Sequence, residues 1–181
     1  DFCALGMEPV LETEEAIKRA TVVIDCTPKG IGRRNKERYY SKFADKGKGF
    51  LAQGSESEFG KKYAVGINDD ALMTEDDQFI QIVSCNTHNI SCITKTIALD
   101  GLGSENFVAG KYVCIRRAND MHQEGGYIPS PQVNVHLSDQ YGSHHANDAA
   151  ALFKTLDMDL NMFSSAMKVN SQYMHVLWFN L

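Results

Sequence analysis

The fold of this chain is decided by the segment Ile80-Gln81-Ile82-Val83-Ser84-Cys85-Asn86-Thr87-His88-Asn89-Ile90. Residues 80–83 form a short run rich in β-branched side chains, which is typical of a buried strand. Apolar residues then recur at helical spacing over residues 90–98, and Asn86 or Thr87 is expected to cap that helix. Cys85 therefore lies where a strand ends and a helix begins.

Cys85 has the surroundings of a nucleophile in this position. The N-terminus of a helix presents free N–H groups and the positive end of the helix dipole, and both stabilise a thiolate. The same N–H groups can hold an oxyanion that forms beside the sulfur. A buried structural cysteine is the alternative interpretation, and the segment alone leaves both open.

The composition is that of an ordinary globular protein, with 43% hydrophobic and 23% charged residues. The net charge of -5 provides no positive excess for nucleic acid or an anionic membrane, and no apolar run approaches the roughly 18 residues that span a bilayer. The five cysteines include no Cys-x-x-Cys pair, which favours reduced thiols over a disulfide framework or a metal site. We therefore expect a cytoplasmic protein that binds neither nucleic acid, nor membrane, nor metal.

The residues before this segment predict a short helix and then a βαβ unit. The helix is expected at residues 12–20, and the unit's buried parallel strand, basic helix and second strand at 21–27, 33–43 and 49–52. In such sheets, ligands bind at the carboxyl ends of the strands. Three candidate residues follow the two strands: Thr27, Pro28 and Gly54. The intervening Gly-Ile-Gly lacks the third glycine of a dinucleotide fingerprint and is expected to be a turn.

The residues after this segment predict a second set of strands. A strand at 107–115 leads into Arg116 and Arg117, and a long polar stretch from 121 to 143 is expected to have little regular structure. A helix is expected at 147–156. Two strands joined by a turn are expected at 161–169 and 173–181.

Six motifs in the same order resemble the archaeal-type (type II) glyceraldehyde-3-phosphate dehydrogenases. They are Ile24-Asp25-Cys26-Thr27-Pro28-Lys29-Gly30-Ile31-Gly32, Gln53-Gly54, Val83-Ser84-Cys85-Asn86-Thr87, Ile115-Arg116-Arg117-Ala118, Ser143-His144-His145 and Tyr173-Met174-His175. The resemblance implies an α/β fold: a partial Rossmann-like parallel sheet over residues 1–83, then part of an α+β mixed-sheet catalytic domain over 84–181. It also implies a fragment whose phosphate loop lies upstream and whose catalytic sheet continues downstream.

The resemblance implies the phosphorylating oxidation of glyceraldehyde 3-phosphate with NAD or NADP, in a homo-oligomer. Cys85 would form the thioester, His175 would be the base, and inorganic phosphate would release the product. Ser84, Asn86 and Thr87 would bind substrate, as would His144 and His145 through positive charge. Gly54, Arg117, Thr27 and Pro28 would contact the dinucleotide.

The chain departs from this family pattern after Cys85. His88 and Asn89 stand where the family has Thr-Gly, and His88 could compete with His175 as the base because it shares a helix face with Cys85. Two alternatives therefore stay open. One is an aspartate-semialdehyde or N-acetylglutamyl-phosphate reductase, which also uses a cysteine between strand and helix, and the other is a non-catalytic scaffold protein.

Overall fold

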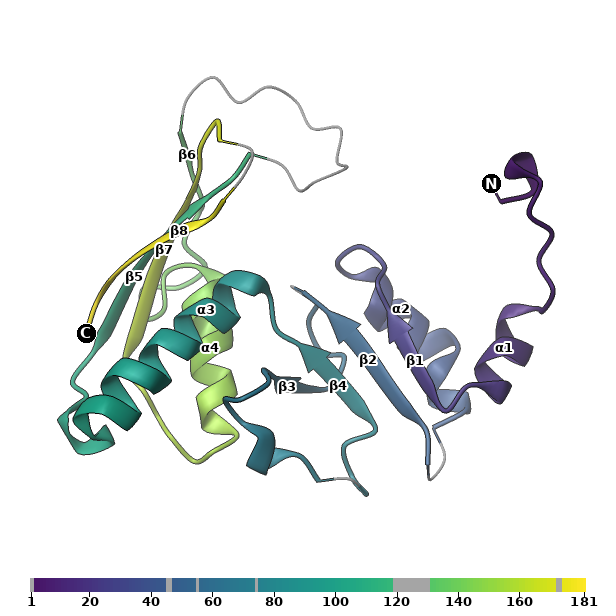
Figure 1. Cartoon of the computed structure of the whole chain (residues 1–181), viewed down its shortest axis with the longest axis horizontal. Helices are drawn as coiled ribbons and strands as arrows, with labels where there is room; N and C mark the ends of the chain where they lie inside the picture. Colours follow the sequence, from purple (N-terminus) through teal and green to yellow (C-terminus); the bar gives the residue numbers. More distant parts are fainter. Residues whose placement is uncertain (1, 45–46, 55, 74, 119–130, 172–173) are drawn as a thin grey trace. The chain divides into compact units, whose positions relative to one another are not determined.

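The structure is a computed structural model that describes residues 2–44, 47–54, 56–73, 75–118, 131–171 and 174–181 (Figure 1). The α-helices are α1 (Thr13–Arg19), α2 (Ile31–Arg38), α3 (Cys85–Ile93) and α4 (His144–Lys154), and a π-helix, Thr94–Leu102, continues α3. The strands are β1 (Val22–Asp25), β2 (Gly49–Gln53), β3 (Lys61–Tyr63), β4 (Phe79–Ile82), β5 (Gly110–Arg116), β6 (Gln132–Val133), β7 (Met162–Lys168) and β8 (Val176–Asn180). Short 3-10 turns lie at Phe2–Leu5, Tyr40–Lys42, Asp69–Ala71 and Ser104–Asn106.

The chain divides into two units. The first comprises Asp1–Lys61 and Leu72–Ile82, and the second comprises Lys62–Ala71 and Val83–Leu181. The short segment Lys62–Ala71 thus groups with the second unit, which the sequence pattern did not indicate. No helix in the described part of the chain is long and apolar enough to cross a membrane.

The first sheet has the strand order β1-β2-β4-β3, in which β1, β2 and β4 are parallel. The first unit's core is aromatic: Phe50 stacks on Tyr40 at 5.2 Å and on Phe79 at 4.9 Å between ring centroids. The βαβ prediction is confirmed, with α2 and a 3-10 turn in place of one longer helix.

The prediction that β1 is buried is wrong. Val22 and Ile24 keep 51% and 67% of their surfaces exposed. The strand is an edge of the sheet, so only β2 pairs with it among the described strands. An apolar run is typical of a strand covered on both faces. The run itself does not show whether neighbouring strands and helices cover the strand.

The second sheet is mixed, with the order β6-β7-β5-β8. Strand β5 is parallel to β7 and antiparallel to β8, and β6 is antiparallel to β7. Helices α3 and α4 pack against this sheet (Figure 1), and Ile90, Phe153 and Met162 are buried in the core between them. The predicted α/β fold class, a parallel sheet followed by a mixed one, is confirmed.

Strands β7 and β8 are not neighbours in this sheet, because β5 lies between them. Two predicted elements of the second unit have other bounds in the structure. Helix α4 begins at His144 rather than at residue 147, because Ser143 has the extended backbone of a capping residue. The expected strand at 173–181 is shorter in the structure, and residues 172–173 lie outside the described residues.

Candidate active site

Cys85 is the first residue of α3, and its side chain is exposed. The predicted passage from strand to helix is confirmed, but the cap is Ser84, so the prediction of Asn86 or Thr87 is wrong. Ser84 has an extended backbone, and its Oγ accepts a hydrogen bond from the Thr87 N–H at 3.4 Å. Helix α3 therefore starts early enough that Cys85 is part of its first turn, whose N–H groups lack partners within the helix.

The first turn of α3 is held by its own hydrogen bonds. Asn86 and Thr87 are buried, and the Thr87 Oγ1 lies 3.0 Å from the Ser84 Oγ. The Ser91 hydroxyl donates to the Thr87 carbonyl at 2.8 Å. These contacts fix the backbone on either side of Cys85, and the burial of Asn86 and Thr87 favours a positioning role for both.

The His88 ring, in the first turn of α3, makes a polar contact with Val65. Its Nε2 lies 3.2 Å from the Val65 carbonyl oxygen, in the segment that joins the second unit. A neutral ring that donates Nε2–H to this carbonyl leaves only Nδ1 as a proton acceptor. This contact directs the Nε2 side of the His88 ring toward Val65.

His144 and His145 form the first turn of α4, with ring centroids 3.9 Å apart. His145 is only 1% exposed. Its Nδ1 lies 3.1 Å from the Ser143 Oγ, which lies 2.7 Å from the Ser164 Oγ. Burial, together with the nearby charges of His144, Arg116 and His175, lowers the pKa of His145 to about 3. His145 is therefore neutral at pH 7, whereas the sequence pattern predicted a cationic phosphate ligand.

The neutral state of His145 makes the stability of the protein depend on pH. The unfolded chain binds a proton at the ordinary pKa of 6.5, while the folded chain resists it down to about 3. The contribution of neutral His145 to the free energy of unfolding is thus fully present above pH 6.5. It is lost as the pH falls toward 3, at about 1 kcal/mol per pH unit. In urea unfolding from pH 7 to 4, we expect the wild-type protein to lose stability more steeply than His145→Asn. Parallel pH dependences for the two proteins would contradict this assignment.

His175 lies just before β8, next to the end of β5. The backbone N–H of Arg117 donates a hydrogen bond to the His175 Nδ1 at 3.3 Å. The ring is half-buried, and its charge acts on His145. The second unit therefore brings His175 to the same side-chain cluster as His144 and His145.

Cys114 lies near both Arg116 and Cys85. It is fully buried on β5, and burial raises the pKa of its thiol to about 12. The charge of Arg116 lowers this pKa and the charge of Cys85 raises it, so both groups lie close to Cys114. Arg116 acts on both Cys114 and His145, so Cys85 and the histidines lie in the same region of the second unit.

Thr27, Pro28 and Gly54 lie at the carboxyl ends of β1 and β2 in the first unit. The backbone N–H of Thr27 donates to the Asp25 Oδ1 at 2.9 Å, and the Tyr40 hydroxyl donates to the other carboxylate oxygen at 2.7 Å. Burial raises the pKa of Asp25, but the hydrogen bonds from Thr27, Asn35 and Tyr40 outweigh it and hold the pKa below its ordinary value. The sequence analysis missed this carboxylate, although its place at the end of an apolar strand was a signal.

Helix α2 does not offer a phosphate site at its N-terminus. The buried carboxylate of Glu56 accepts a hydrogen bond from the Gly30 N–H at 2.7 Å. It occupies the position where a phosphate would bind a helix start. Gly54, in contrast, has a positive φ of 79°, and a Cβ built there would meet nothing within 4 Å. The open space at Gly54 fits the approach of a cofactor, while α2 does not fit its phosphates.

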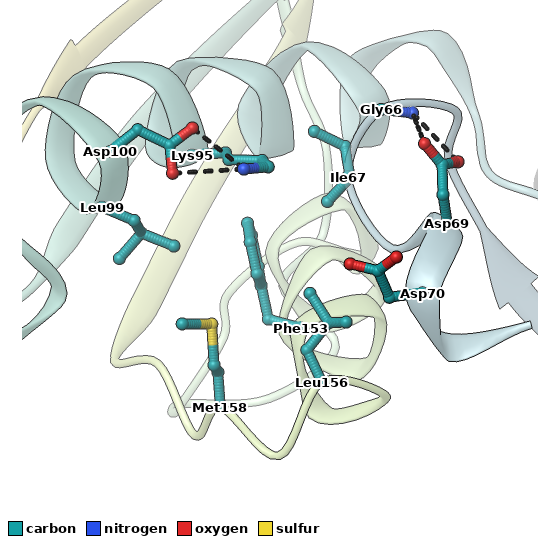
Figure 2. A pocket seen from close by; sticks show the side chains of 10 residues that line it. All are labelled: Gly66, Ile67, Asp69, Asp70, Lys95, Leu99, Asp100, Phe153, Leu156 and Met158. Atoms are coloured by element: carbon teal, nitrogen blue, oxygen red, sulfur yellow. Dashed lines mark hydrogen bonds and ion pairs between the residues drawn. The ribbon is translucent and has the colours of Figure 1, made fainter.

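A cavity of about 340 Å³ lies in the second unit (Figure 2), and Cys85 is not among the residues that line it. Its residues come from the π-helix, from the end of α4 and from the segment Lys62–Ala71. The lining holds three carboxylates, Asp69, Asp70 and Asp100, and one lysine. This lysine, Lys95, pairs with Asp100 at 2.9 Å. This excess of carboxylates repels a phosphorylated substrate, so the cavity is not part of the candidate active site.

Comparison with known proteins finds curated archaeal relatives but no matching family model. The chain is 29% identical over 188 residues to glyceraldehyde-3-phosphate dehydrogenase of Pyrobaculum arsenaticum, with 99% of this chain and 49% of the relative covered. It is 34% identical over 163 residues to the protein of the same name from Methanopyrus kandleri, covering 86% and 41%. The corresponding Archaeoglobus fulgidus protein is 27% identical over 186 residues, covering 97% and 48%. The chain spans about half the length of the curated relatives it matches.

Proposed function

Because the chain is related to the archaeal glyceraldehyde-3-phosphate dehydrogenases, as its motifs predicted, we propose that it takes part in the oxidation of an aldehyde through a thioester on Cys85. The observation that carries this proposal is an exposed cysteine at the first position of a helix. The substrate we propose is glyceraldehyde 3-phosphate, and the product is an acyl phosphate formed with inorganic phosphate.

The chemistry of Cys85 follows from its position. The thiolate attacks the aldehyde carbon, forming the C–S bond and an oxyanion that helix N–H groups can hold. This oxygen takes up a proton from solvent, which gives the thiohemiacetal hydroxyl. His175 takes the hydroxyl proton of the resulting thiohemiacetal as hydride leaves its carbon, which produces the thioester. A phosphate oxygen then attacks the thioester carbon, and the Cys85 thiolate departs.

A nicotinamide cofactor, NAD or NADP, would supply the hydride acceptor when bound. We propose that Thr27, Pro28 and Gly54 in the first unit and Arg117 in the second contact it. The open space at Gly54 supports this assignment, since backbone there can approach a ligand. The Glu56 carboxylate at the start of α2 supports a placement of the cofactor's phosphates elsewhere.

The substrate class can be tested directly with the full-length protein. We expect reduction of NAD or NADP with glyceraldehyde 3-phosphate, and we expect this reduction to depend on inorganic phosphate. Aspartate semialdehyde and N-acetylglutamate semialdehyde, offered under the same conditions, are the matched controls. Turnover with either semialdehyde in preference to the phosphotriose would favour the reductase alternative, and no turnover with any aldehyde would favour a scaffold protein.

A further inference from the structure

Asp25 is a carboxylate whose acceptor capacity is filled within the first unit. It lies at the end of β1 and is 5% exposed. One of its oxygens, Oδ1, accepts hydrogen bonds from the Thr27 N–H at 2.9 Å and from the Thr27 hydroxyl. The other, Oδ2, accepts from the Asn35 amide at 2.9 Å and from the Tyr40 hydroxyl at 2.7 Å. A carboxylate has about four such positions, so these donors leave none for a ligand.

The contact with Asp25 gives the Thr27 hydroxyl a fixed direction. Hydrogen bonds from Thr27, Asn35 and Tyr40 hold the pKa of the carboxyl below its ordinary value, so the group is ionised at pH 7 and can only accept. The Thr27 hydroxyl has a single proton, and that proton must fill the contact with Asp25. Acceptor capacity is what remains on the Thr27 oxygen. A ligand atom that bonds to this oxygen therefore has to be a hydrogen-bond donor.

The loop that follows β1 is poor in N–H groups that a ligand could use. The Thr27 N–H is already donated, and Pro28 has none. The Gly30 N–H donates to the buried Glu56 carboxylate at 2.7 Å, and the Ile31 N–H donates to the Pro28 carbonyl at 3.0 Å. A phosphate bound by backbone needs several such donors, and the buried carboxylates repel it. The backbone of this loop therefore disfavours a phosphate.

Thr27 borders space in which a ligand can approach. Strands β1 and β2 are parallel neighbours, and Asp25 is in register with Ala52. Thr27 and Gly54 each follow two residues later, so they leave the ends of neighbouring strands at the same level. Thr27 is exposed, and a Cβ built on Gly54 would meet nothing within 4 Å. The acceptor oxygen of Thr27 thus lies at the carboxyl edge of a parallel sheet, where such sheets bind their ligands.

We propose that Asp25 makes Thr27 a hydrogen-bond acceptor, so that this loop binds an uncharged N–H or O–H donor of the cofactor rather than one of its phosphates. The inference rests on the proposed function, in which the loop contacts NAD or NADP. Asp25 is a positioning residue, because it acts on the cofactor only through Thr27. A nicotinamide dinucleotide carries such donors on its carboxamide, its ribose hydroxyls and its adenine amine.

The first experiment measures binding without turnover. NAD and NADP are titrated calorimetrically into the full-length wild-type protein, Thr27→Val, Thr27→Ser and Asp25→Asn. Valine has the shape of threonine but no acceptor, so we expect the affinity for the preferred cofactor to fall about 5- to 10-fold, as for loss of one hydrogen bond. Thr27→Ser keeps the hydroxyl and should bind as the wild type does. Asp25→Asn should show a loss like that of Thr27→Val, because an amide cannot accept all the donors around it.

Two control variants separate this role from structural support and from charge. Tyr40→Phe removes another hydrogen bond to the same carboxylate, so it should lower the unfolding temperature and leave cofactor affinity unchanged. Lys29→Gln removes an exposed cation from the loop and should also bind the cofactor as the wild type does. A loss in Lys29→Gln with none in Thr27→Val would overturn the proposal, because the loop would then bind a phosphate. Equal losses in Tyr40→Phe and Asp25→Asn, with Thr27→Val unaffected, would overturn it as well.

Analogues of the cofactor then identify the donor. Acetylpyridine in place of nicotinamide lacks the carboxamide N–H, hypoxanthine in place of adenine lacks the amine, and a dideoxyribose in place of either ribose lacks its hydroxyls. The analogue without the true donor should bind equally to the wild type, Thr27→Val and Asp25→Asn, as in a double-mutant cycle. A merely structural role for Asp25 would instead lower the affinity for every analogue alike. Losses in both variants that persist with all analogues would contradict the proposal.

These measurements also separate the inference from the proposed function. Cofactor binding that depends on Thr27, in a protein that oxidises no aldehyde, would support the inference while the proposed function fails. Aldehyde oxidation with equal cofactor binding by all variants would reject the inference and leave the proposed function standing. A wild-type protein that binds neither NAD nor NADP would overturn both. Because Thr27 is exposed, Thr27→Val tests the inference even if Asp25→Asn does not fold.

Discussion

Replacing Cys85 with serine should abolish aldehyde oxidation in the full-length protein, by roughly 10⁴-fold or more. The serine hydroxyl is almost the same size as the thiol but is hardly ionised near neutral pH, so the helix N-terminus has no anion to stabilise. Because Cys85 is exposed and is not part of the core, the variant should fold and unfold as the wild type does. Thermal unfolding provides this control. Wild-type turnover by Cys85→Ser would remove the nucleophile assignment.

The same assignment predicts which thiol reacts first with an alkylating reagent. Cys114 is buried and its raised pKa keeps it protonated, and Cys92 is half-buried. Cys3 and Cys26 are exposed, but neither starts a helix. We therefore expect Cys85 to be modified fastest at neutral pH, as judged by mass spectrometry of digested samples. Faster modification of Cys26, Cys92 or Cys114 would contradict it, and a scaffold protein would need no such reactive thiol.

The second large effect is expected at His175. If it takes the hydroxyl proton, His175→Asn should lower kcat by about 10²–10⁴-fold, the usual contribution of a general base. His88→Asn is the matched control and should stay near the wild-type rate. The reason is structural, because the His88 ring already contacts the Val65 carbonyl, whereas His175 lies beside the end of β5 and close to His145.

The hydrogen bond from Arg117 to His175 allows a finer test of this role. The backbone N–H donates to Nδ1, so the neutral ring carries its own proton on Nε2. To accept a proton at Nε2, the ring must first carry its own proton on Nδ1. This change breaks the hydrogen bond from Arg117, and loss of a typical hydrogen bond costs about 1 kcal/mol. An asparagine can donate a hydrogen bond but cannot act as a base. Near-normal turnover in His175→Asn together with an inactive His175→Ala would show that His175 donates to the oxygen instead. A large loss in His88→Asn alone would show that the wrong histidine was chosen.

The central segment could be predicted from sequence because its signals are local. A β-branched run followed by helical spacing indicates β4 and α3, and the capping hydrogen bond of α3 lies within two residues of Cys85. The cap was assigned wrongly because Ser84, Asn86 and Thr87 are all residues that cap helices. Which of the three residues caps the helix depends on backbone angles that the sequence does not show.

Features that depend on distant neighbours were not predictable in this way. His145 was expected to be charged, but its burial and its Ser143 contact depend on how α4 packs against β7. The exposure of β1 depends on its place at the sheet edge.

The burial of Cys114 also has a consequence for damage by oxidants. An exposed cysteine such as Cys85 can be oxidised by peroxide to a sulfenic acid, which a second thiolate can convert into a disulfide. Cys114 is almost entirely protonated at pH 7 and therefore attacks poorly. Cys92 is seven residues further along α3, a rise of about 10 Å, beyond the reach of a disulfide. Within the second unit, recovery of oxidised Cys85 therefore depends on small thiols from solution, and without them oxidation proceeds to the irreversible acids.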